Sequence, residues 1–231
     1  MKVVFLVFSP SGHTLLTAQN FMNMLENKGV SCDMINITKN DNYIQKEDIT
    51  HTLYSDIGEH CMLVVCAPIY AGHCEQNMLR IIHMLPKRKN GRIPAILLVT
   101  YGGVHSSVAL EEMGKGIRSR GYIPIMGIKI AAEHTLTATF KKRINRQLPG
   151  EKEQQVLAEA AEIAVNVLNG KTDPVDAKKV LEYAPFPKRL MFRILSQEKI
   201  HGKYKKVAIN SQICNGCGQC IRACPVNMFA Y

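Results

Sequence analysis

The sequence predicts an α/β protein with a doubly wound, five-stranded parallel sheet and a small cysteine-rich segment at its C-terminal end. Apolar, β-branched runs alternate with helical patterns through about residue 170, as parallel sheets require. The pattern then breaks at Asp173-Pro174 and Pro185-Phe186-Pro187, because proline interrupts regular structure. Four of the eight cysteines crowd between positions 214 and 224.

The elements follow one another in a regular order. Val3–Phe8 is a continuous apolar run, typical of a strand buried on both faces, and apolar residues then recur at helical spacing between Leu15 and Leu25. Further strands are expected over Cys32–Ile37, Cys61–Ala67, Pro94–Thr100 and Tyr122–Ile130. Helices are expected over Glu75–Leu85, Ser106–Arg120 and Glu151–Leu168, and over the mixed polar stretch 42–57.

Length and composition set the domain organisation. The chain has 231 residues, 46% of them hydrophobic, which suits one sheet domain with a core of its own plus a small appendage. We expect a sheet domain over residues 1–170, a basic linker over 171–204 and the cysteine-rich domain over 205–231, the last of these a candidate for truncation.

The predicted linker carries much of the positive charge. Positions 185–206 hold seven Lys or Arg and one Glu, and a short basic helix is expected over Lys188–Leu195. Two interpretations stay open for this segment: a solvated connection, or a docking patch for an acidic redox partner or for the cysteine-rich domain.

The net charge of +10 fits simple solubility, an acidic protein partner or an anionic cofactor. Nucleic acid is not an expected partner, because no nucleic-acid-binding signature is present. No apolar stretch approaches the roughly 18 residues of a membrane span, and the N-terminal run is too short for a signal peptide. Clustered cysteines without a disulfide pattern favour a reducing, cytoplasmic compartment. The oligomeric state is not determined.

The cysteine run has the pattern C-x2-C-x2-C-x3-C-P, which is the spacing of bacterial iron–sulfur proteins. Two-residue spacers let the backbone wrap one face of a cuboidal cluster, and Gly216 and Gly218 permit the positive φ angles that such a loop needs. Zinc sites usually use two separated C-x2-C knuckles instead. The predicted 4Fe-4S ligands are Cys214, Cys217, Cys220 and Cys224.

The role of Cys224 is less determined than that of the other three. In two-cluster ferredoxins the fourth cysteine of this run ligates the other cluster, and a second motif follows. No second motif occurs before Tyr231, where this sequence ends. Three alternatives stay open: a shortened form, a Cys224 that bends back to the same cluster, or a partner that supplies the remaining ligand.

The turn after the first strand is a candidate anion site. Hydroxyl groups and the amides of a helix N-terminus can bind a phosphate monoester without any lysine. The alternative is an ordinary helix start, with His13 facing solvent rather than adding charge to the phosphate. The candidate residues are Ser9, Ser11, Gly12, His13 and Thr14.

Two further loops follow later strands and combine tyrosine with glycine. Because the carboxyl ends of parallel strands share one edge of a sheet, all three loops are expected to converge on one crevice. Tyr70 is expected to stack on a flat ring, while the backbone of Gly102 and Gly103 bonds its polar edge. The candidate residues here are Pro68, Ile69, Tyr70, Gly72, Thr100, Tyr101, Gly102 and Gly103.

These motifs are similar to the flavodoxin pattern, in which S/T-x-S/T-G-x-T binds the FMN phosphate and P-x-Y-x-G with a Tyr-Gly loop surrounds the isoalloxazine. Joined to the cysteine run, the chain resembles the EFR1-type flavodoxin–ferredoxin fusion family. The resemblance implies a flavodoxin-like FMN-binding domain followed by a bacterial ferredoxin-type domain. It departs from the family at Pro10, where glycine is common, at His13, and in lacking a second cysteine motif.

Two cofactors of this kind imply electron transfer. FMN accepts two electrons and passes them singly, whereas an iron–sulfur cluster passes one, so the pair would link one-electron and two-electron redox protein partners. No catalytic side chain is nominated. The alternatives are a flavin-dependent reductase of a small molecule such as a quinone, which needs a pocket beside FMN, and a non-enzymatic iron–sulfur redox sensor.

The remaining histidines and cysteines carry weaker expectations. His73, His105 and His134 flank the crevice and are expected to be surface or hydrogen-bonding groups, since their spacing does not suit a metal. Cys32, Cys61, Cys66 and Cys74 are expected to act as small buried hydrophobes. For Cys66 and Cys74, reaction with oxidants near the crevice is the alternative.

Overall fold

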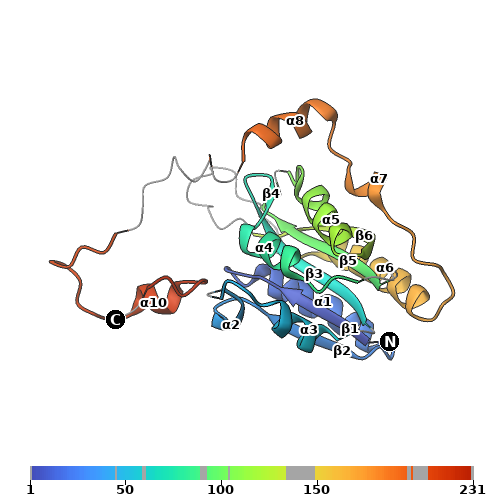
Figure 1. Ribbon diagram of the computed structural model, residues 1–231, viewed down its shortest axis with the longest axis horizontal. Coiled ribbons are helices and arrows are strands. Elements are labelled where there is room, and N and C mark those ends of the chain that lie inside the picture. The colour runs from blue at the N-terminus through green and yellow to red at the C-terminus, as the bar shows by residue number, and fades with distance from the viewer. Residues whose placement is uncertain are drawn as a thin grey trace.

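Figure 1 shows the computed structural model of the chain. It describes residues 2–44, 46–58, 61–88, 93–103, 105–133, 149–196, 199 and 208–229.

Five parallel strands form the sheet, in the order β2-β1-β3-β5-β6. The chain starts at β1, goes outward to β2, returns to β3 on the other side of β1 and then continues to β5 and β6 (Figure 1). This order is that of the doubly wound, flavodoxin-like class, so the predicted fold class is confirmed. The strands are β1 (Lys2–Val7), β2 (Cys32–Asn36), β3 (Cys61–Tyr70), β5 (Ile93–Tyr101) and β6 (Tyr122–Ala131).

A sixth strand, β4 (His73–Cys74), was not predicted and pairs antiparallel with the end of β3. The turn between them consists of Ala71 and Gly72, both with positive φ, at 51° and 84°. Two-residue hairpin turns favour this conformation because it matches the twist of the flanking strands. A strand of two residues is too short to leave a periodic pattern in the sequence.

Helices cover both faces of the sheet (Figure 1). Helices α1 and α6 lie on one face and contact each other, and α4 and α5 contact each other on the opposite face. The predicted helix over 42–57 is in fact two short helices. The bounds are α1 (His13–Glu26), α2 (Asp41–Ile44), α3 (Thr50–Ile57), α4 (Gln76–Met84), α5 (Ala109–Ser119) and α6 (Glu151–Leu168).

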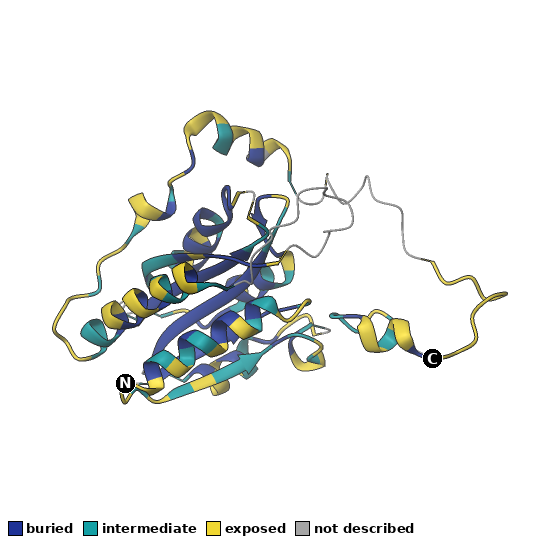
Figure 2. Cartoon of the chain, turned by 180° about the vertical axis from the view of Figure 1, so that it is seen from behind, coloured by how far each residue is buried: buried dark blue, intermediate teal, exposed yellow. Residues whose placement is uncertain are grey.

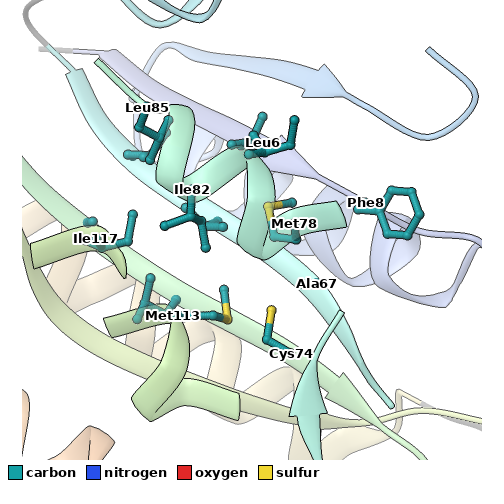
Figure 3. Packing of buried hydrophobic residues seen from close by; sticks show 14 of the residues in the cluster. Leu6, Phe8, Ala67, Cys74, Met78, Ile82, Leu85, Met113 and Ile117 are labelled. Atoms are coloured by element: carbon teal, nitrogen blue, oxygen red, sulfur yellow. The ribbon is translucent and has the colours of Figure 1, made fainter. Parts of the chain in front are cut away.

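Strand β1 contributes to two separate apolar layers, because successive side chains point to opposite faces of a sheet. Val3, Phe5 and Val7 pack toward α1 and α6. Val4 and Leu6 belong to the opposite layer, together with Met78 and Ile82 of α4 and Met113 of α5 (Figure 3). Burial on both faces explains why the strand sequences are continuously apolar rather than alternating.

Part of the predicted linker packs against the sheet domain. It contains α7 (Lys178–Leu181) and α8 (Phe186–Ile194), and α8 begins two residues before the predicted basic helix. The carboxylate of Asp176 accepts two hydrogen bonds from Arg118 of α5, at 2.6 and 2.8 Å, and Leu181 is completely buried. Most of α8 is exposed (Figure 2), but Phe192 is buried in a small cluster with Val108 and Ala184.

Within the described ranges, no helix is both long and apolar enough to span a membrane.

Candidate functional site

The site lies at the carboxyl edge of the sheet, where β1 and β3 are neighbours. From this pair the chain winds outward in opposite directions, to β2 on one side and to β5 and β6 on the other. Such a switch point leaves a crevice outside the strand ends, and ligands of doubly wound sheets bind there. Strands β1, β3 and β5 all end at this edge, so the loops that follow them lie there together, as the sequence predicted.

The loop after β1 is organised by Ser9. Its buried hydroxyl accepts a hydrogen bond from the Leu15 amide at 2.9 Å, and its own amide donates to Thr38 Oγ1 at 2.8 Å. Ser9 therefore shapes the loop, and its hydroxyl is already engaged within the protein. Gly12, with φ of 86°, provides the left-handed residue that turns the chain into α1.

The start of α1 offers the groups that would contact an anion. The amides of His13 and Thr14 lie in the first turn, where no preceding turn supplies a carbonyl acceptor. Ser11 and Gly12 are exposed at the same end. No acidic residue lies in the first turn of α1, so the positive end of the helix dipole is not neutralised there. These residues fit a phosphate monoester.

Thr14 joins two of the predicted loops directly. Its hydroxyl shares a hydrogen bond of 2.6 Å with the hydroxyl of Thr100, and both side chains are almost completely buried. Thr100 lies in β5 and pairs with Pro68 of β3 in the sheet. These three predicted site residues thus connect the strand ends to one another beneath the crevice.

The end of β3 and the β4 hairpin form the next wall. Pro68 is buried in the sheet, and its carbonyl accepts a hydrogen bond from the Glu75 amide. Ile69 packs on the apolar core. Tyr70 is half-buried, and burial, reinforced by Glu75, raises the pKa of its hydroxyl to about 12, so the ring is neutral at physiological pH.

Gly72 is required for two reasons. Its φ is 84°, and a Cβ atom there would lie 2.6 Å from the Phe192 ring and 2.9 Å from Ser107 Cβ. A larger residue would therefore push α8 away from the hairpin.

Tyr101 is the last residue of β5 and is half-buried. Its carbonyl accepts a hydrogen bond from the Ala132 amide at 2.9 Å. Gly102 is half-buried and Gly103 is exposed with φ of 78°. Their backbone groups lie at the same edge as the α1 N-terminus, which is the predicted arrangement of the loops.

The cysteine segment holds its predicted ligands in two environments. Cys214, Cys217 and Cys220 are exposed, whereas Cys224 is buried and its Sγ accepts a hydrogen bond from the Met228 amide at 3.2 Å. Gly216 and Gly218 both have positive φ, as predicted, and Gly218 starts the short helix α10 (Gln219–Ala223). The described side chains form no group of three or more His, Cys, Asp or Glu positioned around a metal ion. The donor set fits a cluster by residue type and spacing.

This segment docks beside the predicted phosphate loop. The Lys39 amide donates to the Pro225 carbonyl at 2.9 Å, and Asn227 Nδ2 donates to the Lys39 carbonyl at 3.0 Å and to Asp41 at 2.8 Å. Val226 packs on the apolar core. Lys39 follows Thr38, which accepts the Ser9 amide. In Figure 1, α10 accordingly lies next to the end of the sheet domain where α2 is found.

Sequence reasoning missed Thr38, Lys39 and Asn227. Thr38 and Lys39 follow β2, so the rule that ligand loops follow strands could have identified them. The contact of Asn227 depends on a segment nearly 190 residues away, and no local pattern indicates it.

Two of the three histidines near the site lie in the described part of the chain. His73 is a buried hydrogen-bonding group rather than a surface one: Nδ1 donates to Glu112 at 2.6 Å and Nε2 donates to the Leu195 carbonyl at 2.8 Å. The bond to Glu112 raises the pKa of His73. His105 is exposed and packs edge-on against Phe192. His134 lies outside the described residues.

The expectation of buried scattered cysteines is confirmed for Cys61, Cys66 and Cys74, while Cys32 is half-buried. Burial raises the pKa of the Cys66 and Cys74 thiols, so little thiolate is available to react with oxidants.

Comparisons with known proteins support the fold of the sheet domain and the 4Fe-4S motif of the C-terminal segment. Residues 206–229 match the sequence model of the 4Fe-4S binding domain family. No curated protein matches the sequence.

Several solved structures resemble the sheet domain at low sequence identity. An NADH:FMN oxidoreductase in its apo form is 13% identical, covers 70% of this chain and 87% of its own, and has a TM-score of 0.50. Oxidised flavodoxin 1 from Bacillus cereus is 13% identical over 72% of this chain and 98% of its own, with a TM-score of 0.49. A flavodoxin from the domain Archaea is 17% identical over 73% of this chain and 99% of its own, with a TM-score of 0.46. Together with the strand order, the first of these supports a flavodoxin-like sheet domain, which in this chain is followed by a 4Fe-4S binding domain.

Proposed function

We propose that the protein transfers electrons between a 4Fe-4S cluster in its C-terminal segment and FMN at the carboxyl edge of the sheet. The observation that carries the proposal is the docking of residues 225–227 on Lys39, next to the loop that Ser9 organises. The two cofactors would then lie at the same edge of one molecule. Bound FMN would exchange electrons in pairs and the cluster singly, which links one-electron and two-electron partners.

The residues of this chain would have binding and positioning roles. Ser11 and the amides at the start of α1 would hold the phosphate, while Tyr70 and the Tyr101–Gly103 backbone would contact the ring system. Cys214, Cys217 and Cys220 would ligate the cluster, with Cys224 as the fourth candidate. We further propose that the chain belongs to the EFR1-type fusions, and that its positive charge favours acidic redox partners.

Anaerobic reconstitution with FMN, iron and sulfide tests the cofactor assignment. We expect both cofactors in the purified protein. The Cys217→Ser variant should lose the cluster and keep FMN, whereas the Ser11→Ala variant should weaken FMN binding at least tenfold, because a hydrogen bond to a charged group contributes roughly 1.5–3 kcal/mol. Ser55→Ala, at an exposed serine on α3, is the matched control. Full iron content in Cys217→Ser would refute the ligand assignment.

Rapid mixing of the reconstituted protein with a one-electron donor tests the transfer itself. Bleaching of the cluster absorption should precede flavin reduction. The rate constant of this second step, the reduction of the flavin, should not depend on protein concentration. A second step that scales with concentration would mean transfer between molecules and would contradict the proposal.

A flavin-dependent reductase is the second candidate function. It is favoured by a small cavity beside Tyr101 and Gly103, and one fold neighbour, with a TM-score of 0.50, is an NADH:FMN oxidoreductase. Steady-state turnover of a quinone without any protein acceptor would support this function. Turnover that requires a protein acceptor would support the electron-transfer function.

A further inference from the structure

A small cavity of about 260 Å³ lies between the start of α5 and the segment that leads into α8. Ligand pockets for drug-sized molecules usually measure roughly 300–1,000 Å³, so this one suits a smaller molecule. The lining residues that determine its chemistry include Tyr101, His105, Ser106, Ser107, Tyr183 and Lys188.

The outer wall of the cavity is fixed to the sheet domain. The Tyr183 hydroxyl is hydrogen-bonded to the Ser106 hydroxyl, and Ala184 packs with Val108 and Phe192 in a small buried cluster. The Lys129 ammonium lies 4.1 Å from the centre of the Tyr183 ring. The segment predicted as a linker therefore forms part of a built pocket.

The polar groups of the cavity favour an anion. Among its described lining residues there is no Asp or Glu, whereas Lys188 contributes a positive charge and His105 a second titratable nitrogen group. Burial, reinforced by the positive charge of Lys188, lowers the pKa of His105, which leaves Lys188 as the charged group of the cavity and His105 as a neutral hydrogen-bonding group.

Ser107 is the most specific indication of a ligand. The residue is 3% exposed, and its Oγ has no hydrogen-bond partner within the described part of the chain. Buried hydroxyl groups are normally hydrogen-bonded, because an unmade bond costs roughly 1–3 kcal/mol. Its φ of 39° is also unusual for a residue other than glycine, and such conformations concentrate at binding sites.

We propose that this cavity is a binding site for a small aromatic carboxylate. Lys188 would pair with the carboxylate, the Ser107 hydroxyl and the His105 ring would donate hydrogen bonds to it, and the aromatic part would lie between Tyr101 and Tyr183. The cavity shares Tyr101 and Gly103 with the proposed flavin loops, but the phosphate loop and Tyr70 do not line it. We therefore expect the site to border the proposed FMN site at Tyr101 and Gly103 and to lie away from the phosphate loop.

Calorimetric titration of the full chain with benzoate tests this proposal, with FMN present and absent. Benzoate should bind in both cases, and the neutral analogue benzamide should bind at least tenfold more weakly. The Lys188→Gln variant should lose about tenfold in benzoate affinity, and Lys188→Arg should lose much less. Lys179→Gln, at an exposed lysine of α7, makes the same charge change away from the cavity and should leave binding unchanged.

Equal affinity of wild type and Lys188→Gln, or of benzoate and benzamide, would overturn the proposal. Competition between FMN and benzoate would also overturn it, because the cavity would then be part of the flavin site. Ser107→Ala should weaken benzoate several-fold without affecting the fold, since its hydroxyl bonds to no described group. A protein that binds benzoate but no FMN would refute the proposed function and leave this site intact.

Discussion

The sheet domain and the cysteine segment are stabilised in opposite ways. In β1 every residue after Lys2 is completely buried, whereas in the described part of the C-terminal segment Ile213 is 81% and Met228 is 76% exposed. Figure 2 shows this contrast as a mainly buried sheet and a mainly exposed C-terminal segment. The domain is held by apolar burial on both faces of its sheet. A segment this small cannot build such a core, so it depends on a few polar contacts and on its cluster.

The largest expected effect comes from the core. Leu63→Ala in β3 should lower the free energy of unfolding by roughly 2–5 kcal/mol, because it leaves a cavity in a close-packed layer. Ile213→Ala should change it by less than about 0.5 kcal/mol. Urea unfolding followed by circular dichroism measures both. A similar loss for both variants would mean that the two regions do not differ as described.

A substitution at the hairpin should have the next largest effect. Gly72→Ala and Gly12→Ala both place a side chain at positive φ, which costs roughly 1–2 kcal/mol. Only Gly72→Ala also meets the Phe192 ring and Ser107, so it should cost about 1–3 kcal/mol more. Thermal unfolding of the two variants compares them. Equal destabilisation by the two substitutions would show that α8 can move away from the hairpin without a loss of stability.

The contact between His73 and α8 predicts a pH dependence. Both ring nitrogens donate to oxygen acceptors, which favours the charged imidazolium and raises the folded-state pKa above the unfolded value of about 6.5. This stabilisation is fully present below about pH 6.5 and is lost as the pH rises through the folded-state pKa.

Comparison with His73→Gln isolates this contribution. Wild type should be more stable than the variant by about 1 kcal/mol at pH 5.5, and the difference should shrink toward pH 9. A difference that grows with pH would contradict the assigned charge state.

The smallest effect is expected where the two regions meet. Asn227→Ala removes two side-chain hydrogen bonds to Lys39 and Asp41 at an exposed position, which should cost less than about 1 kcal/mol in the docking of the segment. Hydrogen exchange around Lys39 should accelerate, while the unfolding midpoint of the sheet domain stays unchanged. Met228→Ala is the neighbouring control. Unchanged exchange in Asn227→Ala would show that the contact does not hold the segment.

The sequence alone determined the succession of strands and helices, the five-stranded sheet and the cysteine spacing. These features arise from local patterns: continuous apolar runs for strands buried on both faces, helical periodicity, and a motif contained in eleven residues. The convergence of the three loops also followed, because parallel strands end at one edge.

Tertiary structure alone decided which of these residues act together. The Thr14–Thr100 bond, the docking of Asn227 on Lys39 and the cavity lined by Ser107 and Lys188 each join segments far apart in the chain. The sequence placed α8 in a linker, since prolines break the regular pattern before it and the charge of the segment is mainly basic. Its attachment depends on the room that Gly72 leaves for Phe192, and such a fit between distant side chains leaves no local pattern.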